Sequence, residues 1–201
     1  PLEFEAVLHA TGRRANTEGL GLENTDIELR PNGTIVVDEF CQTAVENVFA
    51  VGDVNGGLQF TYVSLDDFRV VNGYLHGNKE YTTADRKNVP YSTFISPALS
   101  HVGLHKEEAE AAYPNVAVAS LPVANMPRGA VNQDPRGLFR VTVDKDTNLI
   151  LGATLFGKNS EEIINLIKMA IDNKIPYTYI RDQIFTHPTM AENLNDVFKL
   201  I

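Results

Sequence analysis

Apolar and polar residues alternate most regularly in the second half of the chain. Residues 138–144, "LFRVTVD", carry apolar side chains at every second position, which is typical of a half-buried strand. A polar turn at 145–148 and an apolar run at 149–157 follow, and together they predict a β-hairpin. Upstream, the pattern predicts a short helix at 107–113 and a further strand at 115–123. This part of the chain is therefore expected to be α+β.

Helical spacing dominates two other segments. Residues 61–76 favour a helix with Thr61 as its N-cap. A second helix is expected over 160–171, where Asn159 and Glu162 fit a capping pattern and a broad apolar stripe follows. The apolar residues that recur at helical spacing in the first helix are Phe68, Val71 and Leu75.

The first half of the chain predicts short strands separated by loops. "FEAVLHATG", residues 4–12, indicates an apolar strand that runs into a glycine turn. Strands are also expected at 33–38 and at 47–53, the latter apolar on both faces and therefore buried. The polar stretch 77–90 is the best boundary in the chain, near residue 89.

Composition narrows the function classes. The chain has 201 residues, 43% of them hydrophobic, and a net charge of −9, so it can build one large or two small cores. It has no basic run for nucleic acid and no apolar stretch near the roughly 20 residues that span a membrane. The first residues lack the basic and apolar regions of a signal peptide. The single cysteine, Cys41, cannot form an internal disulfide, which favours a cytoplasmic protein. Cys41 is interpreted as a small apolar contact, with a reactive thiol as the alternative.

"IFTHPTMAENL", residues 184–194, contains a histidine and a glutamate five positions apart. Histidine is the usual side chain for proton transfer in proteins, and Glu192 is the obvious acid near His187. Thr189 and Glu192 also fit the capping-box pattern at the start of a last helix. The residues alone leave both interpretations open.

Five phrases occur in one order along the chain. They are "AVLHATGRRANT", "NVFAVGDV", "SPALSHVGLHKEEA", "NLILGATLFGKNSEEIIN" and "HPTMAE". Together they resemble the C-terminal part of a class I pyridine nucleotide-disulfide oxidoreductase, the flavoprotein family of glutathione reductase, dihydrolipoamide dehydrogenase and mercuric reductase. The resemblance implies α/β and α+β architecture. Residues 1–89 would be the tail of the NAD- and FAD-binding domains. Residues 90–201 would be an α+β interface (dimerisation) domain with an antiparallel sheet.

The resemblance also implies cofactor contacts in the first half. Asp53 matches the aspartate that hydrogen-bonds the ribityl and pyrophosphate portion of FAD, and Gly52 lets the backbone approach. The helix that starts near Thr61 would aim its N-terminus at the flavin ring, so Phe60 and Thr61 would be cofactor-binding residues.

At the crossing between the NAD and FAD domains, the resemblance assigns a turn to Gly12. Arg13 would approach FAD or the nicotinamide nucleotide, or would simply be a solvated charge.

In the same family the His-Pro segment reaches across a dimer interface into the other subunit's active site. His187 would then be the acid/base that faces a redox disulfide, and Glu192 would hold its imidazole. The bond between His187 and Pro188 is expected to be cis. The resemblance therefore implies a homodimer, built by residues 90–201.

The sequence departs from the better-known members of this family. Tyr62 stands where they usually have proline, and Asp66 and Asp67 stand where they have small residues. In this the chain resembles the mercuric-reductase-like branch that includes the reactive-chlorine-resistance flavoproteins.

Two nucleotide-binding glycine fingerprints and a Cys-x4-Cys pair, which the family requires, do not occur in these residues. The chain is therefore expected to be part of a longer enzyme, with FAD and NAD(P)H bound mostly by regions outside it, and to be inactive alone. The electron acceptor stays open among a disulfide, a metal ion and a small-molecule oxidant such as hypochlorous acid. The alternative is a non-catalytic dimerisation module with vestigial site residues.

Overall fold

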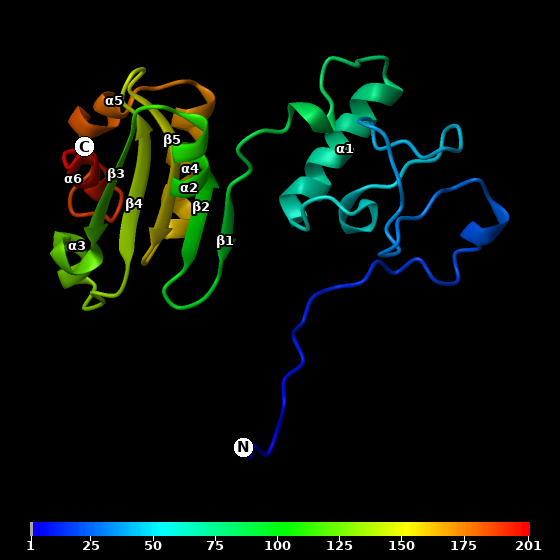
Figure 1. Cartoon of the computed structure of the whole chain (residues 1–201), viewed down its shortest axis with the longest axis horizontal. Helices are drawn as coiled ribbons and strands as arrows, with labels where there is room; N and C mark the ends of the chain where they lie inside the picture. Colours follow the sequence, from blue (N-terminus) through cyan, green and yellow to red (C-terminus); the bar gives the residue numbers. More distant parts are fainter. Residues whose placement is uncertain (1) are drawn as a thin grey trace. The chain divides into compact units, whose positions relative to one another are not determined.

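A computed structural model describes residues 2–201, which form two compact units (Figure 1). The first unit ends at Arg86, and the second runs from Lys87 to Ile201. The division falls inside the polar stretch 77–90, where few apolar residues are available to continue either core.

The second unit is built on a five-stranded antiparallel sheet in the order β1-β2-β5-β4-β3. This confirms the expected α+β unit, including the hairpin of β4 and β5. The strands are β1 Tyr91–Thr93, β2 Leu99–Gly103, β3 Val116–Pro122, β4 Leu138–Asp144 and β5 Leu149–Phe156. The helices are α2 Lys106–Ala112, α3 Pro127–Val131, α4 Ser160–Asp172, α5 Tyr177–Asp182 and α6 Asn193–Phe198, with a 3₁₀ turn at Val123–Asn125.

One face of this sheet carries the core. Phe139, Val141 and Val143 alternate along β4 and are all buried, as the strand pattern predicted. The α4, α5 and α6 helices supply the apolar residues that pack against them. The predicted stripe of α4 is mostly buried in this core, but Leu166 is exposed. Asn159 is the N-cap of α4, although its side chain makes no capping hydrogen bond.

The first unit contains one long helix, α1 Thr61–Leu75. The helix was predicted, but its N-cap was wrong: Phe60 occupies that position, and Thr61 is the first helical residue. The predicted apolar face was also wrong, because Phe68 and Leu75 are exposed. The helix buries Val63, Asp67 and Val70 instead.

The strands predicted in the first unit do not form. Segments 33–38 and 47–53 make only isolated bridges, between Leu29 and Ile35 and between Gln42 and Phe49. Outside α1, the rest of the first unit consists of loops and the 3₁₀ turns Leu22–Asn24, Gly52–Asn55 and Thr83–Asp85. Positive φ angles at Asn47 and Gly52 turn the backbone at both ends of the second predicted strand.

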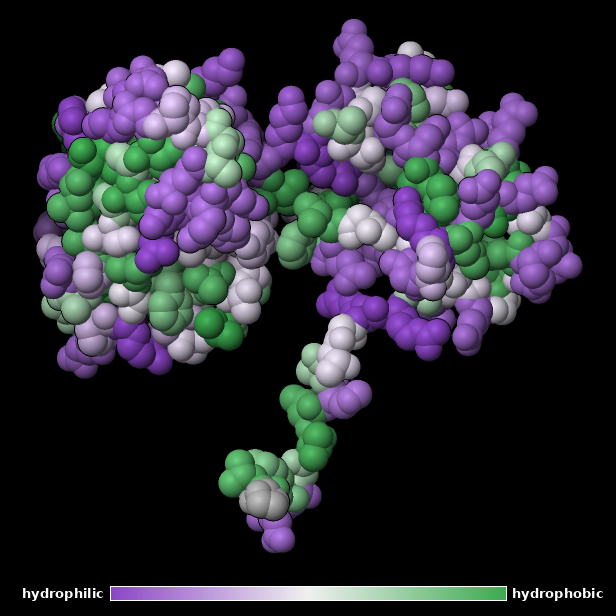
Figure 2. All heavy atoms as spheres, viewed as in Figure 1, coloured by the Kyte–Doolittle hydropathy of each residue, from purple (hydrophilic) through white to green (hydrophobic). Residues whose placement is uncertain are grey.

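Residues 4–12 do not form the predicted strand either. The segment pairs with no other strand among residues 2–201, and its apolar side chains are exposed, as the space-filling view shows (Figure 2). A strand needs a hydrogen-bonding neighbour as well as an apolar pattern. Within residues 2–201, no helix is both long enough and apolar enough to cross a membrane.

Candidate functional site

The 3₁₀ turn Gly52–Asn55 presents the first group of predicted site residues. Gly52 has a φ of 73°, and a Cβ atom there would lie 2.8 Å from Oγ of Ser64 in α1. Only glycine fits this combination of left-handed backbone and close helix. The backbone N–H of Gly56 donates to the carbonyl of Asp53 over 3.2 Å and closes the turn. The Asp53 side chain is consequently held at the surface, 45% exposed.

Arg13 and Asp53 form an ion pair, with 3.1 Å between Nη1 and Oδ2. Both side chains are exposed, so the pair contributes at most about 1 kcal/mol to stability. Gly12, just before Arg13, has a φ of 117°, but residues 6–17 contain no hydrogen-bonded turn, so the turn expected at Gly12 does not form. The structure therefore brings two of the predicted residues, Arg13 and Asp53, together.

The first turn of α1 packs beside this 3₁₀ turn. The carbonyl of Phe60 accepts hydrogen bonds from the N–H groups of Val63 and Ser64. The N–H groups of Thr61 and Tyr62 belong to the first helical turn, where helix geometry provides no intrahelical acceptor. They carry the partial positive charge of the helix N-terminus. Tyr62, which replaces the family's usual proline, is exposed, and the guanidinium of Arg69 lies 5.5 Å from its ring centroid.

Asp67 is buried one helical turn further along, at a position for which the sequence pattern predicted no role. Its Oδ2 atom accepts from the backbone N–H of Gly52 at 2.7 Å and from the side-chain amide of Asn55 at 2.9 Å. Its Oδ1 atom accepts from Nη2 of Arg86 at 2.6 Å. The carboxylate thus joins the 3₁₀ turn to the last residue of the first unit. The only local signal was its position, four residues after Val63 and three before Val70, on the buried side of α1.

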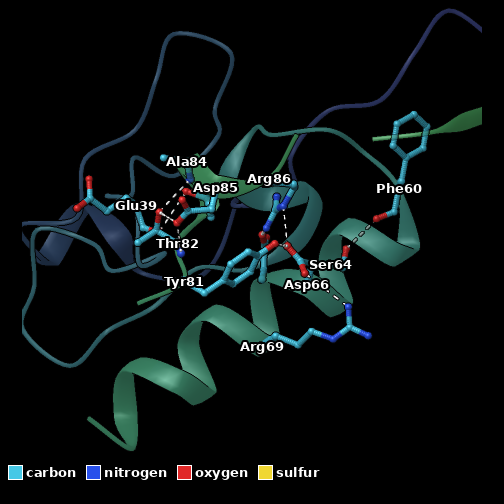
Figure 3. Close-up of polar contacts among 12 residues, drawn as sticks. Glu39, Phe60, Ser64, Asp66, Arg69, Tyr81, Thr82, Ala84, Asp85 and Arg86 are labelled. Atoms are coloured by element: carbon cyan, nitrogen blue, oxygen red, sulfur yellow. Dashed lines mark hydrogen bonds and ion pairs between the residues drawn. The ribbon is translucent and has the colours of Figure 1, made fainter. Parts of the chain in front are cut away.

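Asp66, its neighbour, faces a different set of partners. Arg86, Tyr81 and Arg69 converge on it at the side of α1 (Figure 3). Nε of Arg86 donates over 2.8 Å and the Tyr81 hydroxyl over 3.0 Å. The two acids that depart from the family pattern are therefore bound by one arginine 19 or 20 positions away, a distance at which sequence periodicity carries no signal.

Cys41 lies inside the same unit, completely buried. Burial, and next the negative charge of Asp67, raise the pKa of its thiol to about 12. A thiol with this pKa is not a thiolate at neutral pH. The geometry favours the small buried contact over the reactive thiol.

The second group of predicted residues lies in the Lys87–Ile201 unit. Nδ1 of His187 is 2.9 Å from Oε2 of Glu192. The imidazole is 72% exposed and the carboxylate only 15%. The bond between His187 and Pro188 is cis, as the sequence predicted. Among residues 2–201, no group hydrogen-bonds Nε2 of His187, which is therefore able to meet a molecule from outside the unit.

The predicted capping box of Thr189 and Glu192 was wrong, because α6 begins at Asn193 with Glu192 as its N-cap and without a side-chain capping bond. The Thr189 hydroxyl accepts from the backbone N–H of Glu192 at 3.2 Å, ahead of the helix. The carboxylate of Glu192 turns to His187 instead of completing a box. The side chain of Glu192 therefore binds the histidine and does not cap the helix.

Two asparagines that the sequence did not single out support this loop. The Asn193 amide donates to the carbonyls of Thr189 and Met190. The Asn195 amide donates to the carbonyls of Ile180 and Gln183, at 2.6 and 3.2 Å. These bonds tie the loop before α6 to the end of α5.

The residues around the 3₁₀ turn suit a hydroxylated, anionic cofactor. Asp53 offers an exposed acceptor, Arg13 an exposed cation, and the first turn of α1 offers two N–H donors. Gly52 is itself buried against Ser64 of α1. A metal centre has no comparable support, because the described residues contain no group of three or more potential metal ligands.

Comparison with known families agrees with this arrangement. The pyridine nucleotide-disulphide oxidoreductase model matches residues 2–67, and the dimerisation domain of pyridine nucleotide-disulphide oxidoreductases matches residues 89–198. The chain therefore belongs to the pyridine nucleotide-disulphide oxidoreductase family.

Alignments with individual relatives span almost the whole chain. It is 48% identical to the "Probable pyridine nucleotide-disulfide oxidoreductase RclA" of Escherichia coli K12, over 100% of this chain and 45% of that protein. It is 34% identical to a glutathione reductase of Burkholderia cepacia, over 95% of this chain and 42% of that enzyme. The solved structure of the HOCl-induced flavoprotein disulfide reductase RclA from E. coli superposes with a TM-score of 0.92, covering 96% of this chain and 44% of that one. The chain thus spans less than half the length of these relatives.

Proposed function

We propose that the chain is the C-terminal part of an FAD-dependent, NAD(P)H-using oxidoreductase that passes electrons through a cysteine pair to an acceptor. The observation that carries this proposal is the hydrogen bond between His187 and Glu192. A largely covered carboxylate that holds one imidazole nitrogen while the other stays exposed is the arrangement of a positioned acid/base.

The first unit contributes cofactor contacts in this proposal. FAD supplies the redox chemistry when bound, between NAD(P)H on one side and the cysteine pair on the other. Asp53 accepts a hydrogen bond from the ribityl portion, and Gly52 allows the close approach. Thr61 and Tyr62 direct their N–H groups at the electron-rich edge of the ring, while Phe60 fixes the start of the helix. Arg13, which forms an ion pair with Asp53, balances the negative charge of the phosphates.

The second unit contributes dimerisation and proton transfer. The match to a family dimerisation domain over residues 89–198 supports a homodimer. His187 acts from one subunit on the thiols of the other, and Glu192 keeps the imidazole oriented. The single cysteine supports a cytoplasmic location.

Among the possible acceptors we propose a disulfide first. The relative of known structure is described as a disulfide reductase, and glutathione reductase is another relative. A metal ion ranks second, because the same relative has also been solved as a Cu(II) complex and mercuric reductase is 31% identical over 96% of this chain. An oxidant such as hypochlorous acid ranks third.

The test is flavin binding by the complete protein, purified and stripped of cofactor. The complete protein should recover a flavin absorbance spectrum on titration with FAD, whereas the 201-residue chain alone should bind FAD weakly, because the pyrophosphate-binding glycine turn is absent from it. Asp53→Ala should weaken FAD binding, by about tenfold for one lost charge-assisted hydrogen bond. Asp26→Ala, at an exposed aspartate elsewhere in the first unit, is the matched control. A complete protein that binds no flavin would instead support the non-catalytic dimerisation module.

A further inference from the structure

We infer that Asp67, together with Arg86, is a positioning residue for the turn that carries Asp53. This inference rests on the proposed function, because it gives the turn its role. Neither residue would touch the cofactor; they would act through the Gly52–Asn55 backbone.

The hydrogen bonds of Asp67 bracket Asp53 in the chain. The single oxygen Oδ2 binds the backbone N–H of Gly52, immediately before Asp53, and the side-chain amide of Asn55, two residues after it. Both flanks of the exposed carboxylate are therefore attached to one buried atom of α1. Because α1 is a rigid element of four turns, the attachment gives the turn a fixed position on the helix.

Arg86 offsets the free-energy cost of burying the Asp67 carboxylate. An unpaired charge in a buried position is strongly unfavourable, whereas one with a close cation and filled lone pairs is not. Nη2 of Arg86 lies 2.6 Å from Oδ1 of Asp67, and the two turn donors occupy Oδ2. The donors to the Asp67 carboxylate are therefore supplied by the turn and by Arg86, and the buried Cys41 side chain is a further hydrogen-bond partner.

Asp66 provides the internal contrast. It binds the same arginine from the same helix, at 2.8 Å from Nε of Arg86. Its other partners are Tyr81 and Arg69, outside the 3₁₀ turn. Loss of Asp66 disturbs Arg86 without removing the acceptor that Gly52 and Asn55 share. Comparing variants of the two aspartates therefore distinguishes positioning of the turn from a general effect on the stability of the first unit.

The experiment compares Asp67→Asn with Asp66→Asn in the complete protein. An asparagine at 67 keeps one oxygen and gains an NH₂ group, so either the turn or Arg86 faces a donor instead of an acceptor. The first readout needs no cofactor: deuterium exchange of the peptide containing Gly52–Asn55 in the flavin-free protein. The second is the Kd for FAD, from quenching of flavin fluorescence well below the melting temperature of each variant.

We expect Asp67→Asn to speed exchange in this peptide and to raise the Kd about tenfold, whereas Asp66→Asn should change the Kd less than about threefold. Asn55→Ala removes one of the two bonds between the turn and Asp67, together with the bonds of Asn55 to Ala50 and Gly57, and should give an intermediate Kd. It replaces Asp67→Asn as the decisive variant if that protein does not fold. Equal effects of the two aspartate variants on exchange and Kd, or no effect of Asn55→Ala on either, would overturn the inference.

Asp53→Ala separates the inference from the proposed function. If Asp53→Ala leaves the Kd unchanged, the cofactor role of Asp53 fails. Exchange at Gly52–Asn55 then still decides whether Asp67 holds the turn. If Asp53→Ala weakens binding but Asp67→Asn changes neither exchange nor Kd, the inference alone fails.

Discussion

Nδ1 of His187 lies 2.9 Å from Oε2 of Glu192, and the histidine is exposed while the glutamate is largely covered. The buried partner has little freedom to move, so it sets the direction of the imidazole. Nε2 is the nitrogen left at the surface. This geometry makes His187 the residue whose loss should affect chemistry rather than folding.

In the complete protein, His187→Ala should slow reoxidation of the reduced enzyme by a disulfide, by roughly 10²–10⁴-fold, the usual contribution of a positioned acid/base. FAD binding should stay unchanged, because His187 and Asp53 belong to different units. Stopped-flow absorbance separates flavin reduction by NAD(P)H from reoxidation. Reoxidation at the wild-type rate would mean that the pair has only a structural role.

Glu192→Gln should reduce the same rate less than His187→Ala does. Glutamine keeps an acceptor for Nδ1 but loses the charge that favours the imidazolium. Thr189→Ala is the matched control, since it removes the hydroxyl that accepts from the backbone N–H of Glu192 without touching the His187–Glu192 hydrogen bond. A control variant as slow as Glu192→Gln would mean that loop stability, not the carboxylate, governs the rate.

Cys41 should resist alkylation in the folded chain. With a pKa of about 12, roughly one thiol in ten thousand is ionised at pH 8, and the side chain is also buried. Mass spectrometry after iodoacetamide treatment should find the native protein unmodified under conditions that fully modify it in urea. Equal rates in the two conditions would mean that the first unit opens readily around Cys41.

His101 should make the stability of the second unit depend on pH. It is buried between Thr154 Oγ1 and the carbonyl of Gly103, each at 2.9 Å, and its ring stacks on His105. Burial, with a smaller effect of the His105 charge, lowers its pKa below 6.5. The unfolded chain therefore binds the proton more readily, so stability is fully present above about pH 6.5 and is lost as the pH falls toward the folded-state pKa.

Urea unfolding at pH 7, 6 and 5 measures this effect. The wild-type midpoint should fall with pH, and His101→Gln should show a flatter dependence, although it is less stable at pH 7. His76→Gln, at an exposed histidine in the other unit, should keep the wild-type slope. An unchanged slope in His101→Gln would assign the effect to other groups.

The second unit should form a homodimer through apolar residues that its own core leaves uncovered. Leu166 and Met169 are exposed on α4, three positions apart and hence on one side of the helix. Light scattering at tens of micromolar should give about twice the chain mass of 22.2 kDa, if the dimer has about micromolar affinity. Met169→Glu should shift the chain toward monomer, and Glu107→Gln should not. A wild-type monomer at this concentration would contradict the prediction.

The sequence alone determined the elements whose signal is local. The alternation in β4, the return strand β5 and the apolar stripe of α4 were each readable within one segment, because side-chain direction repeats every two or 3.6 residues. The motif resemblance also selected Gly52, Asp53, His187 and Glu192. Their roles remain predictions, although the structure brings His187 to Glu192.

Only the tertiary structure determined which elements form in the first unit. Residues 33–38 and 47–53 have strand-like patterns, yet strand formation depends on a partner at hydrogen-bonding distance, and they find only isolated bridges. Aspartate is a residue type usually found at the surface, yet Asp67 is buried. Its carboxylate is bound by Arg86, 19 positions later, and by the N–H of Gly52, 15 positions earlier. Pairing between distant residues depends on how the chain folds back on itself, so no periodicity along the sequence could reveal it.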